Sequence, residues 1–278
     1  MSNLKSTTDS LNVEHPEHWV LLLALRASEL QWAAYDTEAT NTLVAGTLPL
    51  DLTAGSYLKA LENAVYDNTA LLNDWKQVRL VADAERMMIM PKELEADDDL
   101  ALDALQAAYP NAQGDWALCA MPRCQALMGF ELPEGVLSFL QRTWNMPQIV
   151  GRLYPMAEHY AAHDRERTGA TMHLNLQPDK ADVVVIKDNR LLLANTYSLR
   201  STADAAYFAL HAWLSCGLDA RHDEMLVTGP LPLRQELLPQ LRTRVSYVMP
   251  AIFPAAALKI GQDAVKAPLH LMLLALCE

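Results

Sequence analysis

The sequence predicts an α/β protein of two domains, each with the element order β-β-β-α-β-α-β. Short apolar runs separated by polar turns alternate with amphipathic helical segments, and the order of elements before Gly169 recurs after it. The halves share no residue-level repeat, so the recurrence is one of topology. A boundary at Gly169 predicts a first domain of residues 1–168 and a second of residues 169–278.

The first half begins with three expected strands in succession. Leu30, Trp32 and Ala34 share one face of the second, as in a strand with a buried side. Further along, Asp97, Asp98 and Asp99 directly precede a helical pattern, where carboxylates cap free N–H groups; we prefer this interpretation to a magnesium site. The expected strands are residues 19–25, 29–35, 42–48, 77–82, 86–90, 116–121 and 125–130, and the expected helices are 56–72, 98–109, 133–143 and 154–167.

The second half contains the most regular segment of the chain, VVVIKDNRLLLANTYSLRSTADAAYF from Val183 to Phe208. Its two apolar runs meet across Asp188-Asn189, a pair that tolerates the positive φ of a two-residue hairpin turn. Ser201 stands three residues before Asp204, which predicts a capping box at the start of a helix. The expected strands of this half are residues 171–176, 182–187, 190–197, 225–228 and 245–248, and the expected helices are 202–216 and 233–241.

The composition is that of a globular protein, with 51% hydrophobic and 20% charged residues. A net charge of −12 without a Lys/Arg cluster argues against nucleic acid and anionic membranes as partners. The longest apolar tract, Leu269 to Cys277, is shorter than the roughly 20 residues of a membrane span. No signal peptide and no C-x-x-C pattern are visible, so we expect a cytoplasmic protein with reduced thiols.

The segment "VVVIKDNRLLLANTYSLRSTADAAYF", followed by a strand ending in "TGPL", resembles a family of bacterial proteins, a domain of unknown function assigned the actin-like ATPase fold. Asn195, Thr202, Asp204 and Tyr207 stand where that family has an Asn, a Thr, an Asp and a Tyr. The resemblance implies two ribonuclease-H-like domains in an actin-like arrangement and a C-terminal helix, residues 268–277, that packs on the first domain. It implies no established activity.

Members of the wider group that hydrolyse ATP resemble one another in glycine-containing hairpin loops, each with an acidic residue, because glycine lets backbone N–H groups approach phosphate and a carboxylate holds Mg²⁺. This chain has no glycine at Leu25–Glu29 or at Leu176–Ala181, and only Gly229 at the adenosine loop. We therefore expect a non-catalytic interaction or scaffold module with an unidentified protein partner and no cofactor. The alternative is an ATPase with unconventional loops, in which Asp179 or Asp182 serves ATP-bound Mg²⁺ and Gly229 lies near the adenine.

Other candidate sites have simpler explanations. No P-loop, G-x-G-x-x-G or G-x-S-x-G motif occurs. His159 and His163 share a helix face beside Glu158 and Asp164, as metal ligands can, but no third ligand is evident, and we interpret this face as solvent-exposed. Asn195 is interpreted as a structural residue at a strand end. We assign no catalytic residue and no metal ligand.

Overall fold

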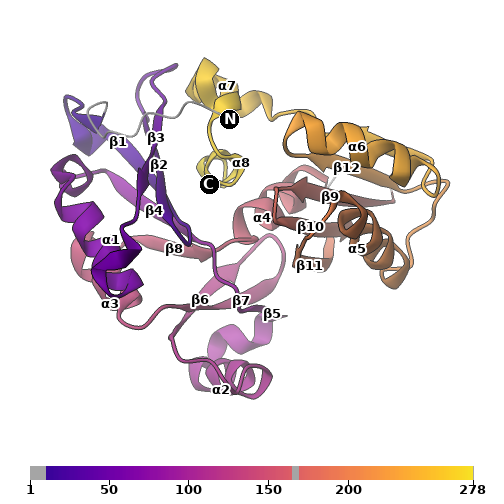
Figure 1. Cartoon of the computed structure of the whole chain (residues 1–278), viewed down its shortest axis with the longest axis horizontal. Coiled ribbons are helices and arrows are strands. Elements are labelled where there is room, and N and C mark those ends of the chain that lie inside the picture. Colours follow the sequence, from indigo (N-terminus) through magenta and orange to yellow (C-terminus); the bar gives the residue numbers. More distant parts are fainter. Residues whose placement is uncertain (1–10, 165–168, 278) are drawn as a thin grey trace. The chain divides into compact units, whose positions relative to one another are not determined.

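The computed structural model describes residues 11–164 and 169–277. The chain forms two compact units, shown in Figure 1. The first unit comprises Met1–Met121, Ala126–Pro155 and Pro254–Glu278, and the second comprises Pro122–Gln125 and Met156–Phe253. These bounds differ from the predicted division at Gly169, because the chain enters the second unit before that glycine and returns to the first at Pro254. The last residues of the predicted helix 154–167 lie outside the described part.

The first unit is built on a five-stranded sheet of order β3-β2-β1-β4-β8. β1 pairs with β2 in antiparallel and with β4 in parallel orientation, and β8 extends the parallel side. β1 is buried along most of its length, which explains its continuous apolar sequence. The strands are β1 (Trp19–Leu25), β2 (Glu29–Asp36), β3 (Val44–Pro49), β4 (Gln77–Ala82) and β8 (Gln148–Gly151).

Two helices of the first unit, α1 (Tyr57–Tyr66) and α3 (Val136–Thr143), lie together, with the ring of Tyr66 edge-on to Phe139 at 6.0 Å. Helix α1 is shorter than the predicted 56–72. It ends because the side-chain amide of Asn68 donates to the Ala64 carbonyl at 2.7 Å, and a 3₁₀ turn follows.

A three-stranded sheet of order β5-β7-β6 is inserted between β4 and α3, with β5 (Met87–Pro91), β6 (Asp115–Met121), β7 (Ala126–Leu132) and α2 (Asp98–Ala108). The predicted order β-β-β-α-β-α-β of the first half takes the helix 98–109 and the strand 116–121, which are α2 and β6, as its last two elements. That detail is wrong, because α3 and β8 occupy those places in the main sheet. Gly129 allows α2 to approach β7, since a Cβ there would lie 2.4 Å from a Leu105 methyl group.

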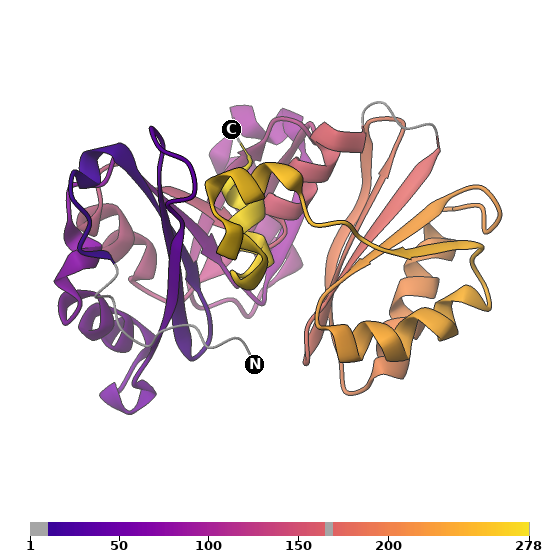
Figure 2. The same ribbon diagram turned by 90° about the horizontal axis from the view of Figure 1, so that it is seen from above.

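The C-terminal segment carries α7 (Ala255–Ile260) and α8 (Leu269–Ala275), and α8 packs against β1 and β4. Figure 2 shows this segment beside the first sheet. Buried Arg79 of β4 donates to the carbonyl of Cys277 at 2.6 Å, a favourable place for a cation because helix C-termini carry partial negative charge. The expected packing of this helix on the first unit is confirmed.

The second unit has a sheet of order β11-β10-β9-β12-β13, the same arrangement as the main sheet of the first unit. The two-residue turn between β10 and β11 has φ of 48° at Asp188 and 62° at Asn189, as predicted. The strands are β9 (Ala170–Leu176), β10 (Lys180–Lys187), β11 (Arg190–Ser198), β12 (Glu224–Thr228) and β13 (Tyr247–Pro250).

Helices α5 (Thr202–Ser215) and α6 (Leu231–Arg242) pack together against one face of this sheet (Figure 2). They enclose a core of aliphatic side chains and Trp213. The predicted capping box is confirmed: Ser201 accepts from the N–H of Asp204, and Asp204 accepts from the N–H of Ser201. A further helix, α4 (Tyr154–His163), runs from the first unit into the second.

Candidate functional site

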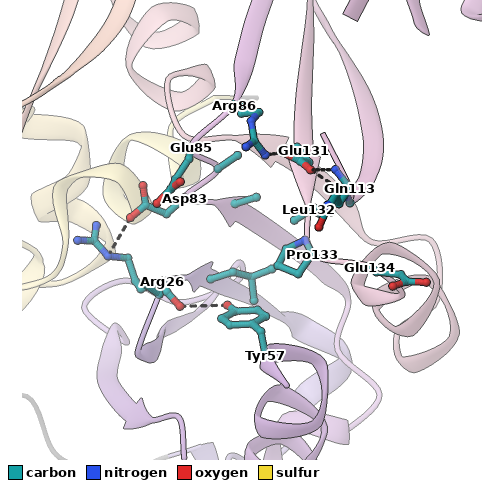
Figure 3. A pocket seen from close by; sticks show the side chains of 15 residues that line it. Arg26, Tyr57, Asp83, Glu85, Arg86, Gln113, Glu131, Leu132, Pro133 and Glu134 are labelled. Atoms are coloured by element: carbon teal, nitrogen blue, oxygen red, sulfur yellow. Dashed lines mark hydrogen bonds and ion pairs between the residues drawn. The ribbon is translucent and has the colours of Figure 1, made fainter. Parts of the chain in front are cut away.

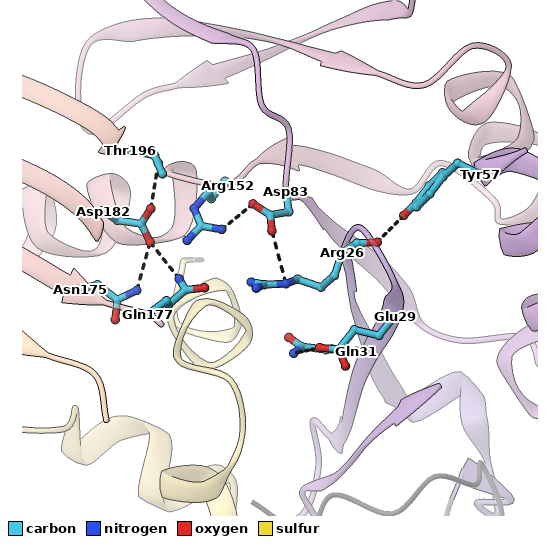
Figure 4. A network of polar contacts seen from close by, with 10 residues as sticks. All are labelled: Arg26, Glu29, Gln31, Tyr57, Asp83, Arg152, Asn175, Gln177, Asp182 and Thr196. Carbon is cyan, nitrogen blue, oxygen red and sulfur yellow. Dashed lines mark hydrogen bonds and ion pairs between the residues drawn. The ribbon is translucent and has the colours of Figure 1, made fainter. Parts of the chain in front are cut away.

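Charged side chains follow directly after each parallel strand of the first main sheet. Arg26 follows β1, Asp83 follows β4 and Arg152 follows β8. The carboxylate of Asp83 pairs with Arg26 Nε at 3.3 Å and with Arg152 Nη1 at 2.5 Å (Figure 4). All three side chains are largely buried, with exposed fractions of 20%, 10% and 5% for Arg26, Asp83 and Arg152. Asp83 is therefore the shared counter-ion of two arginines.

A groove of about 510 Å³ opens beside this cluster and lies wholly within the first unit (Figure 3). It lies between the carboxyl ends of β1 and β4 on one side and the end of β7 on the other. Buried Leu25, Ala82 and Leu132 contribute apolar lining. The other lining residues are Arg26, Ala27, Tyr57, Asp83, Ala84, Glu85, Arg86, Gln113, Gly114, Glu131, Pro133 and Glu134.

Two polar groups in the groove are held by internal contacts. The hydroxyl of Tyr57 donates to the carbonyl of Arg26 at 3.0 Å, and burial together with the charge of Asp83 raises the pKa of Tyr57, which keeps it a neutral donor. Glu131 accepts from Arg86 at 2.5 Å and from the N–H of Gly114 at 2.7 Å. Burial raises the pKa of Glu131, but these donors outweigh that effect and lower it overall, so the carboxylate stays ionised.

The second unit has a row of polar side chains that crosses four adjacent strands. Asp182 of β10 accepts from the Thr196 hydroxyl of β11 at 2.8 Å and from the Asn175 amide of β9 at 3.1 Å (Figure 4). Thr228 of β12 donates to the Asn175 side-chain oxygen at 3.0 Å, and Gln177 also donates to Asp182, at 3.3 Å. Asp182 is only 4% exposed, so neutral hydrogen-bond donors stabilise its carboxylate in the interior.

The three residues predicted to serve a nucleotide have different surroundings. Asp182 belongs to this polar row, whereas Asp179 is exposed in the β9–β10 turn. Gly229 follows Thr228 with φ of 114°, and a Cβ there would lie 2.5 Å from the carbonyl oxygen of Leu176. Close packing against β9 thus accounts for this glycine without a ligand.

The predicted solvent exposure of Glu158, His159 and Asp164 is wrong, because their exposed fractions are only 2%, 3% and 7%. Glu158 accepts from the backbone N–H groups of Arg123 and Cys124, each at 3.1 Å. Burial is the main cause that lowers the pKa of His159 to about 4, and the neighbouring His163, stacked at 4.0 Å, contributes. Among residues 11–164 and 169–277, no group of three or more His, Cys, Asp or Glu side chains is placed to hold a metal ion.

The residues named from the family resemblance have local roles or exposed positions. Asn195 is exposed in β11 and accepts from the N–H of Thr196 at 2.9 Å, while Asp204 belongs to the capping box. Tyr207 is 64% exposed on α5 and stacks on His211. Asp97 caps α2, as predicted, by accepting from the N–H of Leu100 at 3.0 Å.

The fold is that of the actin-like ATPases. A solved Bacteroides thetaiotaomicron VPI-5482 protein "with actin-like ATPase fold and unknown function" superposes with a TM-score of 0.75 at 18% identity, over 95% of this chain and 97% of that one. A PilM–PilN type IV pilus biogenesis complex gives a TM-score of 0.50 at 14% identity, over 93% of this chain and 98% of that one.

The chain belongs to the family described as "Protein of unknown function (DUF3822)", whose model matches residues 8–248. This result confirms the resemblance seen in the sequence. No curated protein matches the chain in sequence. Within the described residues, no helix has the length and apolar character needed to cross a membrane.

Proposed function

We propose that this protein is a non-catalytic interaction module, a pseudo-ATPase that keeps the actin-like fold. The observation that carries the proposal is the structure of the two hairpin turns expected to hold phosphate. Neither Arg26-Ala27-Ser28 nor Gln177-Pro178-Asp179 contains glycine, and none of these residues has a positive φ. Pro178 also lacks a backbone N–H, which removes one donor from the second turn. Phosphate-binding turns depend on converging backbone N–H groups, an arrangement that glycine and a positive φ make possible. Both turns of this chain lack these two features.

The charges around the first turn support the same proposal. Arg26 is the side chain of this turn that offers positive charge, and Asp83 already neutralises it. A phosphate group would have to compete with a buried carboxylate for this arginine. The PilM–PilN complex is an example of a protein with a similar fold that associates with another protein. These points favour an interaction role over nucleotide hydrolysis.

A cytoplasmic location is part of the proposal. Within the described part of the chain, the cysteines form no disulfide bond with one another; they are Cys119, Cys124, Cys216 and Cys277. Free thiols persist in the reducing cytoplasm, whereas secreted proteins commonly form disulfides.

Isothermal titration of the full chain with ATP and Mg²⁺ tests the proposal. We expect no binding in the micromolar range and no release of phosphate above that of buffer. Micromolar affinity or measurable turnover would contradict the proposal. An Arg26→Gly, Pro178→Gly variant supplies the comparison, since it restores glycine to both turns.

A second candidate function, a nucleotide-binding ATPase with unconventional loops, is favoured by the polar row around Asp182. A buried carboxylate beside amide and hydroxyl groups offers the oxygen ligands that Mg²⁺ prefers. In this alternative the carboxylate of Asp179 or Asp182 binds the metal, and Gly229 lies near the adenine. If Asp182 holds the metal, Asp182→Ala would abolish nucleotide affinity, whereas Asp188→Ala, in the distant hairpin turn, would leave it unchanged. Equal nucleotide affinity in both variants would exclude Asp182.

A further inference from the structure

The groove of the first unit has the size of a binding site. Its volume of about 510 Å³ falls within the roughly 300–1,000 Å³ of typical ligand pockets. Its walls come from five separate stretches of the chain, all in the first unit. A protein that does not bind nucleotide would still expose this groove, and the chemistry of the lining determines which ligand fits it.

The charges of the lining residues favour a cation. Arg26 and Arg86 each pair with an acid of the groove, Asp83 and Glu131. Glu85 and Glu134 also line the groove, and both are exposed at its rim. Figure 3 shows them on opposite sides of the groove. Acids therefore outnumber arginines in the lining, and the excess lies at the rim, where a ligand first arrives.

The same arrangement disfavours an anion. A phosphate or carboxylate group would meet two arginines whose charges are already compensated, and it would pass the rim acids on entry. Nucleic acid is disfavoured for the same reason. A ligand with positive charges at both ends and an apolar middle matches the lining better, because apolar residues, among them Leu132 and Pro133, line the groove together with the rim acids.

Tyr57 and Pro133 also shape the groove. The hydroxyl of Tyr57 is fixed by the carbonyl of Arg26, which leaves its ring as a rigid apolar surface, and Pro133 is exposed beside it (Figure 3). Rigid aromatic and proline surfaces suit an extended peptide, because they bind side chains without losing conformational freedom of their own.

We propose that this groove binds a short, extended, cationic segment of a partner protein. Lysine or arginine side chains of the segment contact Glu85 and Glu134, and an apolar side chain between them lies against Tyr57 and Leu132. This inference rests on the proposed interaction function and specifies the surface and the partner's chemistry.

Fluorescence anisotropy of the full chain with two labelled peptides tests the inference. The first is Ser-Gly-Lys-Leu-Val-Leu-Lys-Gly-Ser, and the second carries glutamate in place of both lysines. We expect the lysine peptide to bind at least about tenfold more tightly, with an affinity that falls as salt rises. Absence of lysine-peptide binding below about 1 mM, or equal binding of both peptides, would overturn the proposal.

Matched variants separate the groove from the general negative charge of the chain. Glu85→Gln with Glu134→Gln should weaken lysine-peptide binding about tenfold. Glu93→Gln with Glu95→Gln makes the same change of charge on an exposed turn outside the groove and should change affinity less than about twofold. Equal affinities of the two double variants would overturn the proposal.

Ala27→Trp provides an independent test, because Ala27 is an exposed turn residue that lines the groove and a tryptophan there would fill it. We expect loss of peptide binding with an unchanged urea midpoint, whereas binding equal to that of the parent would overturn the proposal. The titration with ATP is a separate measurement. A chain that binds ATP would refute the non-catalytic function and leave the groove result intact.

Discussion

The main sheets of the two units share a hydrogen-bond frame at equivalent turns. In each, the first turn residue donates its N–H to the first residue of the next strand, and the residue after the third strand donates to the last turn residue. The four bonds are Arg26 to Glu29 at 3.0 Å, Gln177 to Lys180 at 2.8 Å, Leu50 to Ser28 at 2.9 Å and Leu199 to Asp179 at 2.7 Å. The recurrence of topology thus extends to individual backbone hydrogen bonds.

The side chains within this shared frame differ. Arg26, Asp83 and Arg152 follow the parallel strands of the first sheet, whereas the residues in the same places of the second sheet are uncharged: Gln177, Gly229 and Ala251. The side chains on the faces of the two sheets also differ at equivalent positions of the strand registers. The row Thr196, Asp182, Asn175, Thr228 of the second sheet corresponds to the row Thr47, Gln31, Ala24, Val81 of the first.

Backbone hydrogen bonds thus maintain both sheets, while the polar side chains on them vary. One sheet has its charges at the strand ends, and the other has one carboxylate inside a row of neutral donors. Both arrangements satisfy buried polar groups: ion pairs hold Asp83, and hydrogen bonds from amide and hydroxyl groups reach Asp182. Removal of the carboxylate of Asp83 should therefore lower the free energy of unfolding by a different amount from removal of the carboxylate of Asp182.

The largest effect is expected for Asp83→Ala. The change leaves Arg26 and Arg152 without their shared carboxylate in a largely buried place, and breaking such a pair costs about 3–5 kcal/mol. Urea unfolding should show this loss in the free energy of unfolding. Glu93→Ala, at an exposed position, should change it by less than about 0.5 kcal/mol. A loss under about 1 kcal/mol for Asp83→Ala would mean that the ion pairs add little.

The second unit should be the more sensitive to mild acid, because of buried His159. Its pKa is lowered from 6.5 to about 4, so between these values the unfolded chain binds a proton that the folded chain excludes. The contribution of this pKa shift to the free energy of unfolding is fully present above pH 6.5. It is lost as the pH decreases towards 4, and it amounts to about 3 kcal/mol. The charges that act on His159 are those of His163, His173, Arg123 and Asp164.

Urea unfolding of His159→Gln at pH 7 and pH 4.5 checks this expectation. Glutamine cannot titrate, so the variant should lose less stability between the two pH values than the parent does. His211→Gln, at an exposed position of α5, should keep the parent's dependence on pH. A parent-like dependence in His159→Gln would assign the acid sensitivity to other groups.

A smaller effect is expected for Asp182→Asn. Thr196 and Asn175 donate to this carboxylate, and an asparagine of the same shape would turn an NH₂ group towards one of them. The free energy of unfolding should fall by about 1–3 kcal/mol, less than for Asp83→Ala. Asp188→Asn makes the same chemical change in the hairpin turn, where asparagine tolerates the positive φ, and should be nearly neutral. A greater loss for Asp182→Asn than for Asp83→Ala would reverse the comparison.

The sequence predicts elements whose cause is local. The Asp188-Asn189 turn and the capping box at Ser201 depend on neighbouring residues, and both are confirmed. Strand β8 was not predicted, because Gln148–Gly151 is only four residues long and follows a proline. The inserted sheet was misassigned, since its helix and strands have the same patterns as those of the main sheet.

The charged cluster of the first unit was missed for a related reason. Arg26, Asp83 and Arg152 lie far apart in the sequence and meet because three parallel strands end at one edge of a sheet. The available signal was a charged residue directly after each apolar strand, but this signal has meaning only once β8 is known. Whether Glu158 and His159 are buried likewise depends on tertiary packing, which a charged helical pattern does not reveal.

The smallest expected effect compares the N-caps of equivalent helices. Ser56 caps α1 by accepting from the N–H of Lys59 at 3.2 Å, whereas Ser201 caps α5 within a reciprocal capping box with Asp204. Ser201→Ala should cost about 1 kcal/mol, and Ser56→Ala a similar or smaller amount. Asp204→Ala should also lower the free energy of unfolding, because the N–H groups of Arg200 and Ser201 lose their acceptor.

Lys59→Ala is the matched control, since it changes the same position of α1 without removing an acceptor from the cap. Urea midpoints of the four single variants decide the comparison. If Asp204→Ala and Lys59→Ala lower stability equally, the reciprocal half of the capping box contributes nothing. The two helices would then begin by the same mechanism, and the difference between the units would be confined to the side chains at the ends and on the face of their sheets.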